Sequence, residues 1–336
     1  MKGVFKDLER LVALNTANMD EEKKLTAINV LKEMFSFAQT SIVLSARNAV
    51  QAVLFGINCD LKNFNGGLVL SGHIDTVPIR NDYCMDKNCF YGRGTADMKG
   101  FFPCIKKALS SIGVKNMTLP IMIAITFDEE TGNGGISAIR DFFVVNNISL
   151  KYCIVGEPTS SACALVSYGC YDFIIKIKGV ECHISNQETQ NVVTDTLICL
   201  NFLDSIKKDY GRTVIKTTFI NGGDTLNVSS SEYTVGYQIR TMDTTKLTKI
   251  NNDIENFLTK NGIVYFIQNN NTDLIPFENI NSKFAKKLLI NNGNRSMDFF
   301  ATTEAGYYQL LGADTVICGP GDCRLAHTVN EFIFYK

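Results

Sequence analysis

The sequence predicts an α/β protein in which a smaller α+β domain is inserted into a larger one. Three observations support this fold class. Residues 1 to about 160 alternate helix-like and strand-like segments, residues from about 170 follow the order βαββαβ, and the α/β alternation resumes from about residue 276. We therefore expect a larger domain over residues 1–169 and 276–336, and an inserted domain over residues 170–275.

The elements of the larger domain follow from hydrophobic periodicity. Near the N-terminus, Phe5, Leu8, Leu11, Val12 and Leu14 form one apolar helical stripe. Further helices are expected at residues 21–38, 98–112 and 134–144. The apolar, β-branched runs that predict strands are "AVQAVLFGI" (49–57), "GGLVLSG" (66–72), "PIMIAITF" (120–127) and "KYCIVG" (151–156).

The inserted domain has a different texture, with strands and amphipathic helices in a compact order. Its predicted strands are "YDFIIKIKG" (171–179), "RTVIKTTFI" (212–220), "EYTVGYQIR" (232–240) and "GIVYFIQ" (262–268). Its predicted helices are "VVTDTLICLNFLDSIKK" (192–208) and "TTKLTKINNDIENFLTK" (244–260). This order is that of a ferredoxin-like unit with its own core. The Asn-rich "NNNTD" (269–273) predicts a hinge or loop after it.

Composition excludes several classes of protein. The 336 residues include 33 Lys plus Arg and 34 Asp plus Glu, so the net charge of −1 argues against nucleic acid or an anionic membrane as the main partner. No apolar run approaches the roughly 20 residues that span a bilayer, and charges interrupt the N-terminal segment where a signal peptide would be apolar. The 11 cysteines contain no CxxC pair, which favours free thiols in a reducing cytoplasm.

Carboxylates and histidines follow several of the predicted strands. In open α/β sheets, ligands bind outside the carboxyl ends of the strands, so side chains far apart in the sequence converge there. Each short motif alone is also compatible with a surface turn, a solvated loop or a helix cap. The residues concerned are His73, Asp75, Asp97, Glu129, Glu130, Glu157 and His327.

Taken together, these residues suit a pair of divalent cations. The chain has only three histidines, so most ligands of a metal site must be carboxylates. Catalytic zinc sites use histidine and carboxylate ligands, and two-metal hydrolases commonly share a bridging ligand. Two histidines and three carboxylates would complete such a set, and one member of the pair Glu129 and Glu130 would remain free to act as a base. Divalent cations would also explain why adjacent carboxylates follow a buried strand.

The sequence also resembles the dinuclear-zinc deacylases and exopeptidases, a family that includes acetylornithine deacetylase, succinyl-diaminopimelate desuccinylase, aminoacylase and carboxypeptidase G. The resemblance covers nearly the whole chain and implies a zinc-exopeptidase-like catalytic domain with an inserted lid and dimerisation domain. The motifs that carry it are "SGHIDTVP", "YGRGTADMKGFF", "FDEETGNGG", "VGEPTS" and "TEAGYYQLLGADTVICGPGDCRLAHTVNEF".

The resemblance implies a set of metal ligands. His73, Asp97 and Glu157 would bind one zinc ion. Asp97, Glu130 and His327 would bind the other, with Asp97 bridging. Each subunit would therefore hold two Zn²⁺ ions, and Co²⁺ or Mn²⁺ could take their place.

The resemblance also implies roles around the metals. Asp75 would orient and polarise His73, and Glu129 would be the general base that deprotonates the attacking water and then protonates the leaving amine. His183 falls where the family has a lid histidine that crosses a homodimer interface and stabilises the neighbouring subunit's oxyanion. Arg240 and Asn227 match lid positions that bind the substrate carboxylate or oxyanion, although Arg240 is equally compatible with an exposed charge at a strand end.

These observations predict a cytoplasmic, homodimeric, metal-dependent amidohydrolase that acts on a small N-acylated amino acid. Within the family, "GTADMKGFF" and "GEPTS" are most similar to the acetylornithine-cleaving members, and this resemblance implies removal of the acetyl group from N2-acetyl-L-ornithine, giving acetate and ornithine for arginine biosynthesis. The alternatives are a sister hydrolase such as the desuccinylase or a dipeptidase, and a degenerate binding or scaffold paralogue. The segment "HISNQETQNVVTDT" departs from the family's usual lid sequence and leaves fine substrate specificity open.

Overall fold

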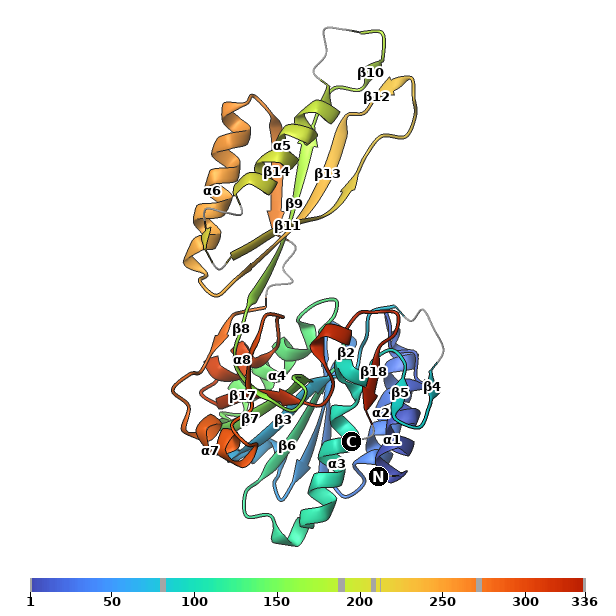
Figure 1. The fold of residues 1–336 in the computed structure, drawn as a ribbon, viewed down its shortest axis with the longest axis vertical. Coiled ribbons are helices and arrows are strands. Elements are labelled where there is room, and N and C mark those ends of the chain that lie inside the picture. Colours follow the sequence, from blue (N-terminus) through green and yellow to red (C-terminus); the bar gives the residue numbers. More distant parts are fainter. Residues whose placement is uncertain are drawn as a thin grey trace. The chain divides into compact units, whose positions relative to one another are not determined.

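The chain forms two compact units (Figure 1). The larger unit comprises residues Met1–Ser167 and Phe277–Lys336, and the smaller unit comprises Tyr168–Pro276. The boundaries predicted from the sequence are 169/170 and 275/276. The structure is a computed structural model that describes residues 2–78, 83–186, 191–206, 210–211, 213–269 and 274–334. The predicted hinge at 269–273 lies almost entirely outside the described residues.

The larger unit is built on a mixed sheet with the strand order β1-β2-β6-β3-β7-β17-β8-β15, and β16 also pairs with β8. The strands β6, β3, β7 and β17 are parallel neighbours at its centre. The strands are β1 (Thr40–Ala46), β2 (Ala49–Ile57), β3 (Asn65–His73), β6 (Ile121–Thr126), β7 (Ser149–Pro158), β8 (Cys163–Ser167), β15 (Phe277–Glu278), β16 (Ser296–Phe299) and β17 (Asp314–Gly319).

Helices cover both faces of this sheet, which explains why its central strands read as continuous apolar runs. Every residue of β6 is buried. Ile121, Ile123 and Ile125 join the core formed with α2 and α3, whereas Met122 and Ala124 are buried on the opposite face. The helices are α1 (Lys2–Val12), α2 (Glu21–Met34), α3 (Phe101–Ile112), α4 (Gly134–Val145), α7 (Lys283–Asn291) and α8 (Ala305–Leu310).

A small three-stranded antiparallel sheet, ordered β18-β5-β4, completes the larger unit. Its strands are β4 (Cys84–Met85), β5 (Cys89–Tyr91) and β18 (Phe332–Phe334). An irregular helical turn, η2 (Thr95–Lys99), connects β5 to α3. This turn explains why α3 begins at Phe101 and not at residue 98 as the sequence predicted.

The smaller unit has the predicted βαββαβ order and a ferredoxin-like sheet. Its four antiparallel strands are ordered β11-β13-β9-β14, and a separate two-stranded ribbon pairs β10 with β12. Side chains on one face of the sheet, such as Ile175 and Ile239, share a buried core with Ile250, Ile254 and Leu258 of α6. The elements are β9 (Gly169–Lys178), β10 (Cys182–His183), α5 (Val192–Ile206), β11 (Thr213–Asn221), β12 (Val228–Ser229), β13 (Glu232–Thr241), α6 (Thr245–Lys260) and β14 (Val264–Asn269).

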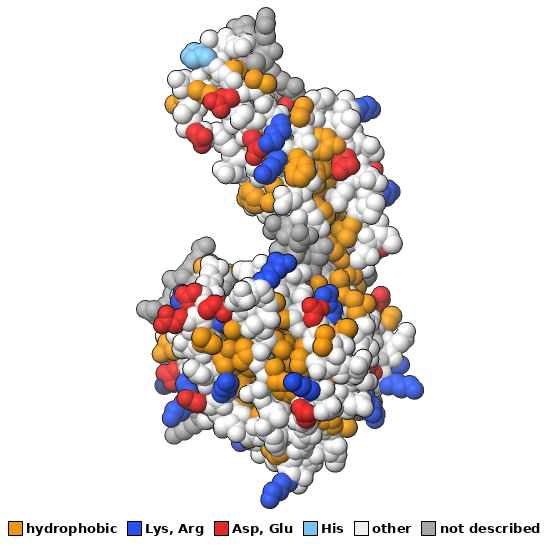
Figure 2. Space-filling view, turned by 180° about the vertical axis from the view of Figure 1, so that it is seen from behind, with side chains coloured by type: hydrophobic (Ala, Val, Ile, Leu, Met, Phe, Trp, Pro, Cys, Tyr) orange, Lys and Arg blue, Asp and Glu red, His pale blue; other side chains and the backbone are white. Residues whose placement is uncertain are grey.

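The surface carries charges of both signs. Figure 2 shows acidic and basic side chains interspersed on each unit, with no large field of one sign on the visible face. Among the described residues, no helix combines the length and the apolar character that crossing a membrane requires. The groups of carboxylates and histidines that could bind a metal ion lie in the larger unit.

Candidate metal centre

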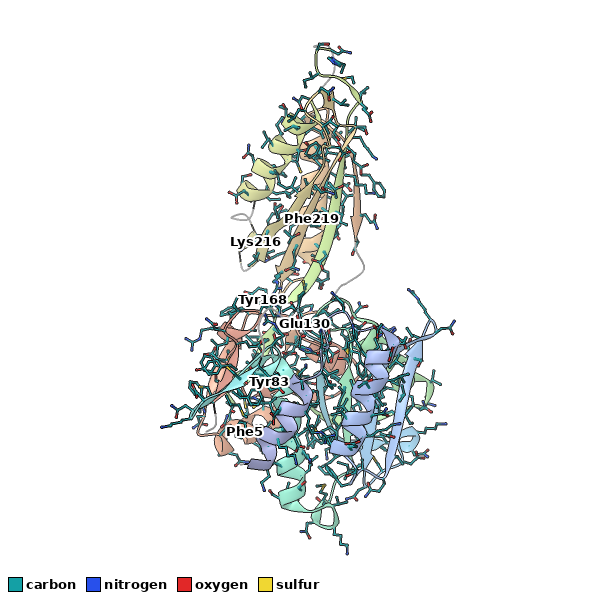
Figure 3. The ribbon with its side chains drawn as sticks, turned by 90° about the vertical axis from the view of Figure 1, so that its right-hand side faces the viewer. Phe5, Tyr83, Glu130, Tyr168, Lys216 and Phe219 are labelled. Atoms are coloured by element: carbon teal, nitrogen blue, oxygen red, sulfur yellow. The ribbon has the colours of Figure 1, made fainter. Side chains whose placement is uncertain are left out.

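The predicted site residues come together at the carboxyl ends of the parallel strands in the larger unit. His73 is the last residue of β3, and Glu157 is the penultimate residue of β7. Glu129 and Glu130 follow β6, and Figure 3 labels Glu130 at this edge of the unit. Because β6, β3 and β7 are adjacent and parallel, their carboxyl ends meet at one edge.

Two groups of potential metal ligands share one carboxylate. His73, Asp97 and Glu157 form the first group, and Asp97, Glu130 and His327 form the second, with the ligand atoms of each group within 4.8 Å of one another. One oxygen of Asp97, Oδ1, lies 3.2 Å from His73 Nε2, and the other, Oδ2, lies 3.4 Å from His327 Nε2. The two oxygens of Asp97 therefore face different histidines, as a bridging carboxylate requires.

The two groups differ in exposure. His73 and Glu157 are buried, with relative exposures of 1% and 4%. The side chain of His327 is 53% exposed, and its Nε2 lies 2.9 Å from Glu130 Oε2. The second group is therefore the one that solvent reaches more readily.

Asp75 contacts His73 and also fixes the backbone of the two glutamates that follow β6. Its carboxylate oxygens accept the backbone N–H groups of Glu129 and Glu130, at 3.2 and 2.9 Å. The Nδ1 atom of His73 lies 3.0 Å from the backbone carbonyl oxygen of Asp75 and 3.5 Å from its carboxylate. The Nδ1 proton of His73 is therefore donated mainly to that carbonyl, which would leave the Nε2 atom, beside Asp97, to bind a cation in a metal-loaded site.

Each of the three consecutive carboxylates after β6 has a different environment. Asp128 accepts the backbone N–H groups of Gly134 and Gly135, at 2.9 and 2.7 Å, and so holds the start of α4. A Cβ atom at Gly135 would lie 2.6 Å from Thr126 Cβ and 2.8 Å from Asp128 Oδ1, so the close approach at this position favours glycine. Glu130 faces His327, whereas Glu129 Oε2 lies 3.8 Å from His73 Nε2 and belongs to neither ligand group.

The electrostatics of the cluster favour bound cations. Burial raises the pKa of both Glu129 and Glu157 well above the ordinary value, and the negative charges of the neighbouring carboxylates add to this effect. Hydrogen bonds to Asp97 and Glu130 raise the pKa of His327 to about 10. Burial favours neutral Asp97, but its hydrogen bonds with both histidines outweigh this and hold its pKa below the ordinary value. Protons on the histidines thus supply the positive charge that divalent cations supply in a metal site, so the donor set fits such ions.

The comparison with known proteins agrees with this geometry. The profile of peptidase family M20/M25/M40 matches residues 69–335. The chain belongs to this family. Its members are metallohydrolases, so the M20/M25/M40 chain is a hydrolytic enzyme with a candidate site for divalent metal ions, as the sequence predicted.

Individual relatives of the M20/M25/M40 chain differ in activity. It is 28% identical to an acetylornithine deacetylase of Buchnera aphidicola subsp. Schizaphis graminum, and the match covers 98% of this chain and 92% of the relative. It is 29% identical to an uncharacterized metallohydrolase of Methanocaldococcus jannaschii, with the same coverage. The crystal structure of a Staphylococcus aureus tripeptidase superimposes with a TM-score of 0.79 at 18% identity, covering 99% of this chain and 93% of that one. This last likeness confirms the predicted fold class.

Two buried ionisable residues near the candidate metal site, Glu304 and Lys99, were not predicted from the sequence. Glu304 precedes α8, and burial raises its pKa to about 7. Ser71 lies on β3, two residues before His73. Its hydroxyl oxygen is 3.4 Å from Glu304 Oε2 and 2.8 Å from the Tyr308 hydroxyl oxygen. Lys99 donates to the carbonyl oxygens of Leu11, in the last turn of α1, and Leu14, just beyond that helix, and burial lowers its pKa to about 7. Glu304 follows two threonines and Lys99 lies between Met98 and Gly100, so neither residue stands out in the sequence.

The three predicted lid residues lie in the smaller unit of the M20/M25/M40 chain. His183 is exposed on β10, where its Nδ1 lies 2.8 Å from the Ser185 hydroxyl. Asn227 precedes β12, and its carbonyl oxygen accepts the N–H of Ile184. Arg240 lies near the opposite end of β13 from the ribbon, and its Nε donates to Gln238 Oε1 at 2.7 Å. Their roles toward substrate stay predictions.

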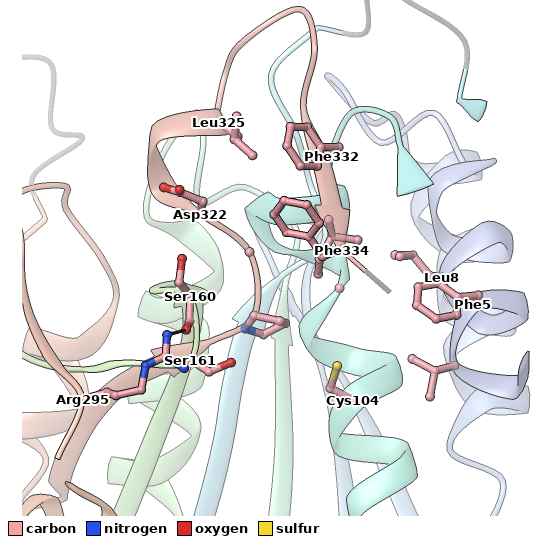
Figure 4. Close-up of a pocket in the computed structure, with 15 residues that line it drawn as sticks. Phe5, Leu8, Cys104, Ser160, Ser161, Arg295, Asp322, Leu325, Phe332 and Phe334 are labelled. Carbon is pink, nitrogen blue, oxygen red and sulfur yellow. Dashed lines mark hydrogen bonds between the residues drawn. The ribbon is translucent and has the colours of Figure 1, made fainter. Parts of the chain in front are cut away.

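A separate apolar cavity of about 560 Å³ lies in the larger unit (Figure 4). It is lined by side chains from α1, α3 and β18, including Phe5, Leu8, Cys104, Phe332 and Phe334. None of the candidate metal ligands lines it. We therefore place the chemistry of the M20/M25/M40 chain at the acidic cluster, where charged groups converge, and not in this cavity.

Proposed function

We propose that the chain is an amidohydrolase that holds two divalent cations, most simply Zn²⁺, and removes the acetyl group from N2-acetyl-L-ornithine to give acetate and L-ornithine. The observation that carries the proposal is the pair of ligand groups that share Asp97 while Glu129 stays outside both. The acetylornithine deacetylase among the relatives supports this substrate. On this basis the chain acts in arginine biosynthesis.

The residues divide the work of amide hydrolysis between them. His73, Asp97 and Glu157 would hold one cation, and the second would be held by Asp97 together with Glu130 and His327. When bound, such cations polarise an amide carbonyl and lower the pKa of water. Zn²⁺ fits the mixed histidine and carboxylate donors, and Co²⁺ or Mn²⁺ accept the same donor set.

Glu129 is the proposed general base. Burial and the negative charges of neighbouring carboxylates raise the pKa of its carboxyl group, and a raised pKa makes a carboxylate a stronger base. It would take a proton from the attacking water and deliver it to the amine nitrogen when the C–N bond breaks. Asp75 fixes the backbone of Glu129 and Glu130 together, so the base and a ligand keep a constant spacing.

The smaller unit would supply substrate recognition in a homodimer. We propose that His183 stabilises the oxyanion in the partner's site and that Arg240 and Asn227 bind the substrate carboxylate or oxyanion. The exposure of His183 on the two-residue strand β10 supports a role toward a group outside its own unit. No disulfide bond joins the 11 cysteines in the described part of the chain, which supports action in the reducing cytoplasm.

A second candidate function is the cleavage of short peptides. The structural likeness to a tripeptidase favours it, because the same cations and base would hydrolyse a peptide bond in place of an acetyl amide. A degenerate paralogue that only binds ligands is opposed by the complete donor set.

The deciding experiment is a hydrolysis assay on protein loaded separately with Zn²⁺, Co²⁺ and Mn²⁺. Substrates would be N2-acetyl-L-ornithine, succinyl-diaminopimelate, several dipeptides and a tripeptide, with Glu129→Gln as the inactive control. Preferred release of acetate from acetylornithine supports the proposal. Faster cleavage of the peptides would replace it with the second candidate, and metal-loaded protein without activity on any substrate would favour the binding paralogue.

A further inference from the structure

A buried carboxylate outside the two ligand groups holds the turn that carries Asp97. Glu331 is only 2% exposed and immediately precedes β18. Its Oε1 atom accepts the backbone N–H groups of Ala96 and Asp97, both at 3.0 Å. The same side chain uses its other oxygen, Oε2, to accept Arg93 Nη1 at 2.7 Å. The backbone of the shared ligand is therefore fixed by a residue from the C-terminal part of the chain.

Arg93 extends this connection to the second histidine ligand. It follows β5 by two residues, and its Nη2 atom donates to the carbonyl oxygen of Thr328 at 3.0 Å. Thr328 directly follows His327. One guanidinium group thus reaches both Glu331, which holds the Asp97 turn, and the backbone beside His327.

The small sheet keeps the two ends of this connection in register. Tyr91 of β5 pairs with Phe332 of β18, and the N–H of Gly92 donates to the carbonyl oxygen of Glu331 at 2.9 Å. Arg93 and Glu331 therefore leave the sheet side by side, each pointing its charged group toward a ligand-bearing turn. This arrangement links segments that lie more than two hundred residues apart in the sequence.

Stability alone is a weak explanation for this ion pair. The side chains of Arg93 and Glu331 are 7% and 1% exposed, so both charges have lost most of their hydration. The Nε atom of Arg93 is also buried with no hydrogen-bond partner among the described residues. Replacing a buried ion pair by apolar residues is often neutral or stabilising, so such a pair is better explained by the geometry that it imposes.

We propose that Arg93 and Glu331 are positioning residues that set the placement of Asp97 relative to His327, and thereby the affinity of the site for both cations. This inference rests on the ligand assignment of the proposed function. Glu331 acts on the shared ligand, so its loss weakens both cations. Arg93 acts on the His327 side as well, so its replacement weakens most strongly the cation that His327 binds.

Two conservative variants separate placement from charge. In Glu331→Gln, one oxygen can still accept the two backbone N–H groups, but the new amide N–H₂ faces the Arg93 guanidinium, donor against donor. In Arg93→Lys, the positive charge remains, but a single ammonium group cannot reproduce the planar fork that reaches both acceptors. A matched control is Lys106→Met, which removes another ion pair of the larger unit, Lys106 with Asp7 at 2.7 Å, away from both ligand turns.

The measurements are the affinities for Zn²⁺, by competition with a chromophoric chelator, and the visible absorption spectrum of the Co²⁺ form. Partners that orient metal ligands typically contribute about 10–100-fold to metal affinity. We expect Glu331→Gln to lose affinity by about this factor for both cations, and Arg93→Lys mainly for the one that His327 binds, with altered Co²⁺ bands in each. Lys106→Met should change only the melting temperature measured in chelator.

Several results would overturn the inference. Wild-type affinities and Co²⁺ spectra in both variants would show that the pair does not position the ligands. An equal loss of affinity in Lys106→Met would show that the effect follows from general destabilisation. If Glu331→Gln does not fold, Arg93→Lys decides alone. Failure of the wild-type protein itself to bind cations would instead overturn the proposed function, so the two failures are distinguishable.

Discussion

The adjacent residues Glu129 and Glu130 allow a sharp test, because they share a backbone anchor and differ only in where their side chains point. Both backbone N–H groups donate to Asp75. The side chain of Glu130 faces His327, whereas that of Glu129 lies outside both ligand groups. Replacing each glutamate by glutamine preserves shape and removes one negative charge, so the two variants are matched controls for each other.

The expected magnitudes differ between the two variants. A general acid–base group contributes about 10²–10⁴-fold to rate, so Glu129→Gln should lower kcat by that factor, or about 3–5 kcal/mol, and leave metal affinity unchanged. Glu130→Gln should instead weaken the cation that His327 binds, and excess metal should restore part of its activity. The assay compares kcat at saturating metal with the metal content after dialysis.

The metal-free protein gives an independent readout. Burial raises the pKa of Glu129, so over the pH range between its unfolded and folded pKa values the native state binds more protons than the unfolded state. Its contribution to stability is therefore present below the unfolded pKa and is lost as pH rises through the folded pKa. In chelator, Glu129→Gln should consequently melt higher than wild type near neutral pH, because glutamine carries no charge to bury, and should show no such advantage at a pH of about 4.

Two results would refute this reasoning. A loss of kcat below tenfold in Glu129→Gln at saturating metal would show that Glu129 is not the base. A metal-free Glu129→Gln protein that melts lower than wild type at neutral pH would show that burial of the ionised carboxylate does not destabilise the metal-free fold.

Three further predictions concern the shared ligand, the lid and the sheet. Asp97→Ala should lose both cations in metal analysis, and retention of either at full occupancy would contradict the bridging assignment. Mixing inactive His183→Ala with inactive Glu129→Gln should restore part of the activity, because a mixed dimer has one site with both residues intact; no recovery after verified subunit exchange would mean that His183 does not act across an interface. Gly319→Ala should lower the free energy of unfolding by about 1–3 kcal/mol in denaturant titrations, because a Cβ atom there would lie 2.0 Å from a backbone carbonyl oxygen of β7. The control Gly3→Ala meets no atom within 4 Å, and equal stability of the two variants would contradict the packing argument.

The sequence predicted several strands of the central sheet well, because strands that are buried on both faces are continuous apolar runs. The run ending at Phe127 gave β6 within one residue at each end, and "AVQAVLFGI" gave β2 without error. The edge strand β1 was missed, since its exposed residues alternate with partly buried ones and its pattern is weak. The strands β8 and β16 were missed as well, because short strands carry little periodic signal.

The chemistry of the site was less completely predictable than its location. Histidines and carboxylates that follow predicted strands can be recognised in the sequence. We could predict that they lie together because the carboxyl ends of parallel strands meet at one edge of the sheet. By contrast, the role of Asp75 depends on two backbone N–H groups, which no side-chain pattern reveals. Arg93 and Glu331 were likewise invisible as a pair, because their contact depends on the register between β5 and β18.

The strand order has a consequence for synthesis of the chain. Strand β17 lies between β7 and β8, although β7 and β8 are nearly consecutive in the sequence. During translation the whole smaller unit emerges before residues 314–319, so one hydrogen-bonding edge of β7 stays open while that unit is already able to fold on its own core. The open edge is a template for pairing with other nascent chains until β17 arrives. The segment Phe277–Lys336 thus closes the sheet and delivers His327 in one late step, which makes its synthesis the event that completes the candidate metal site.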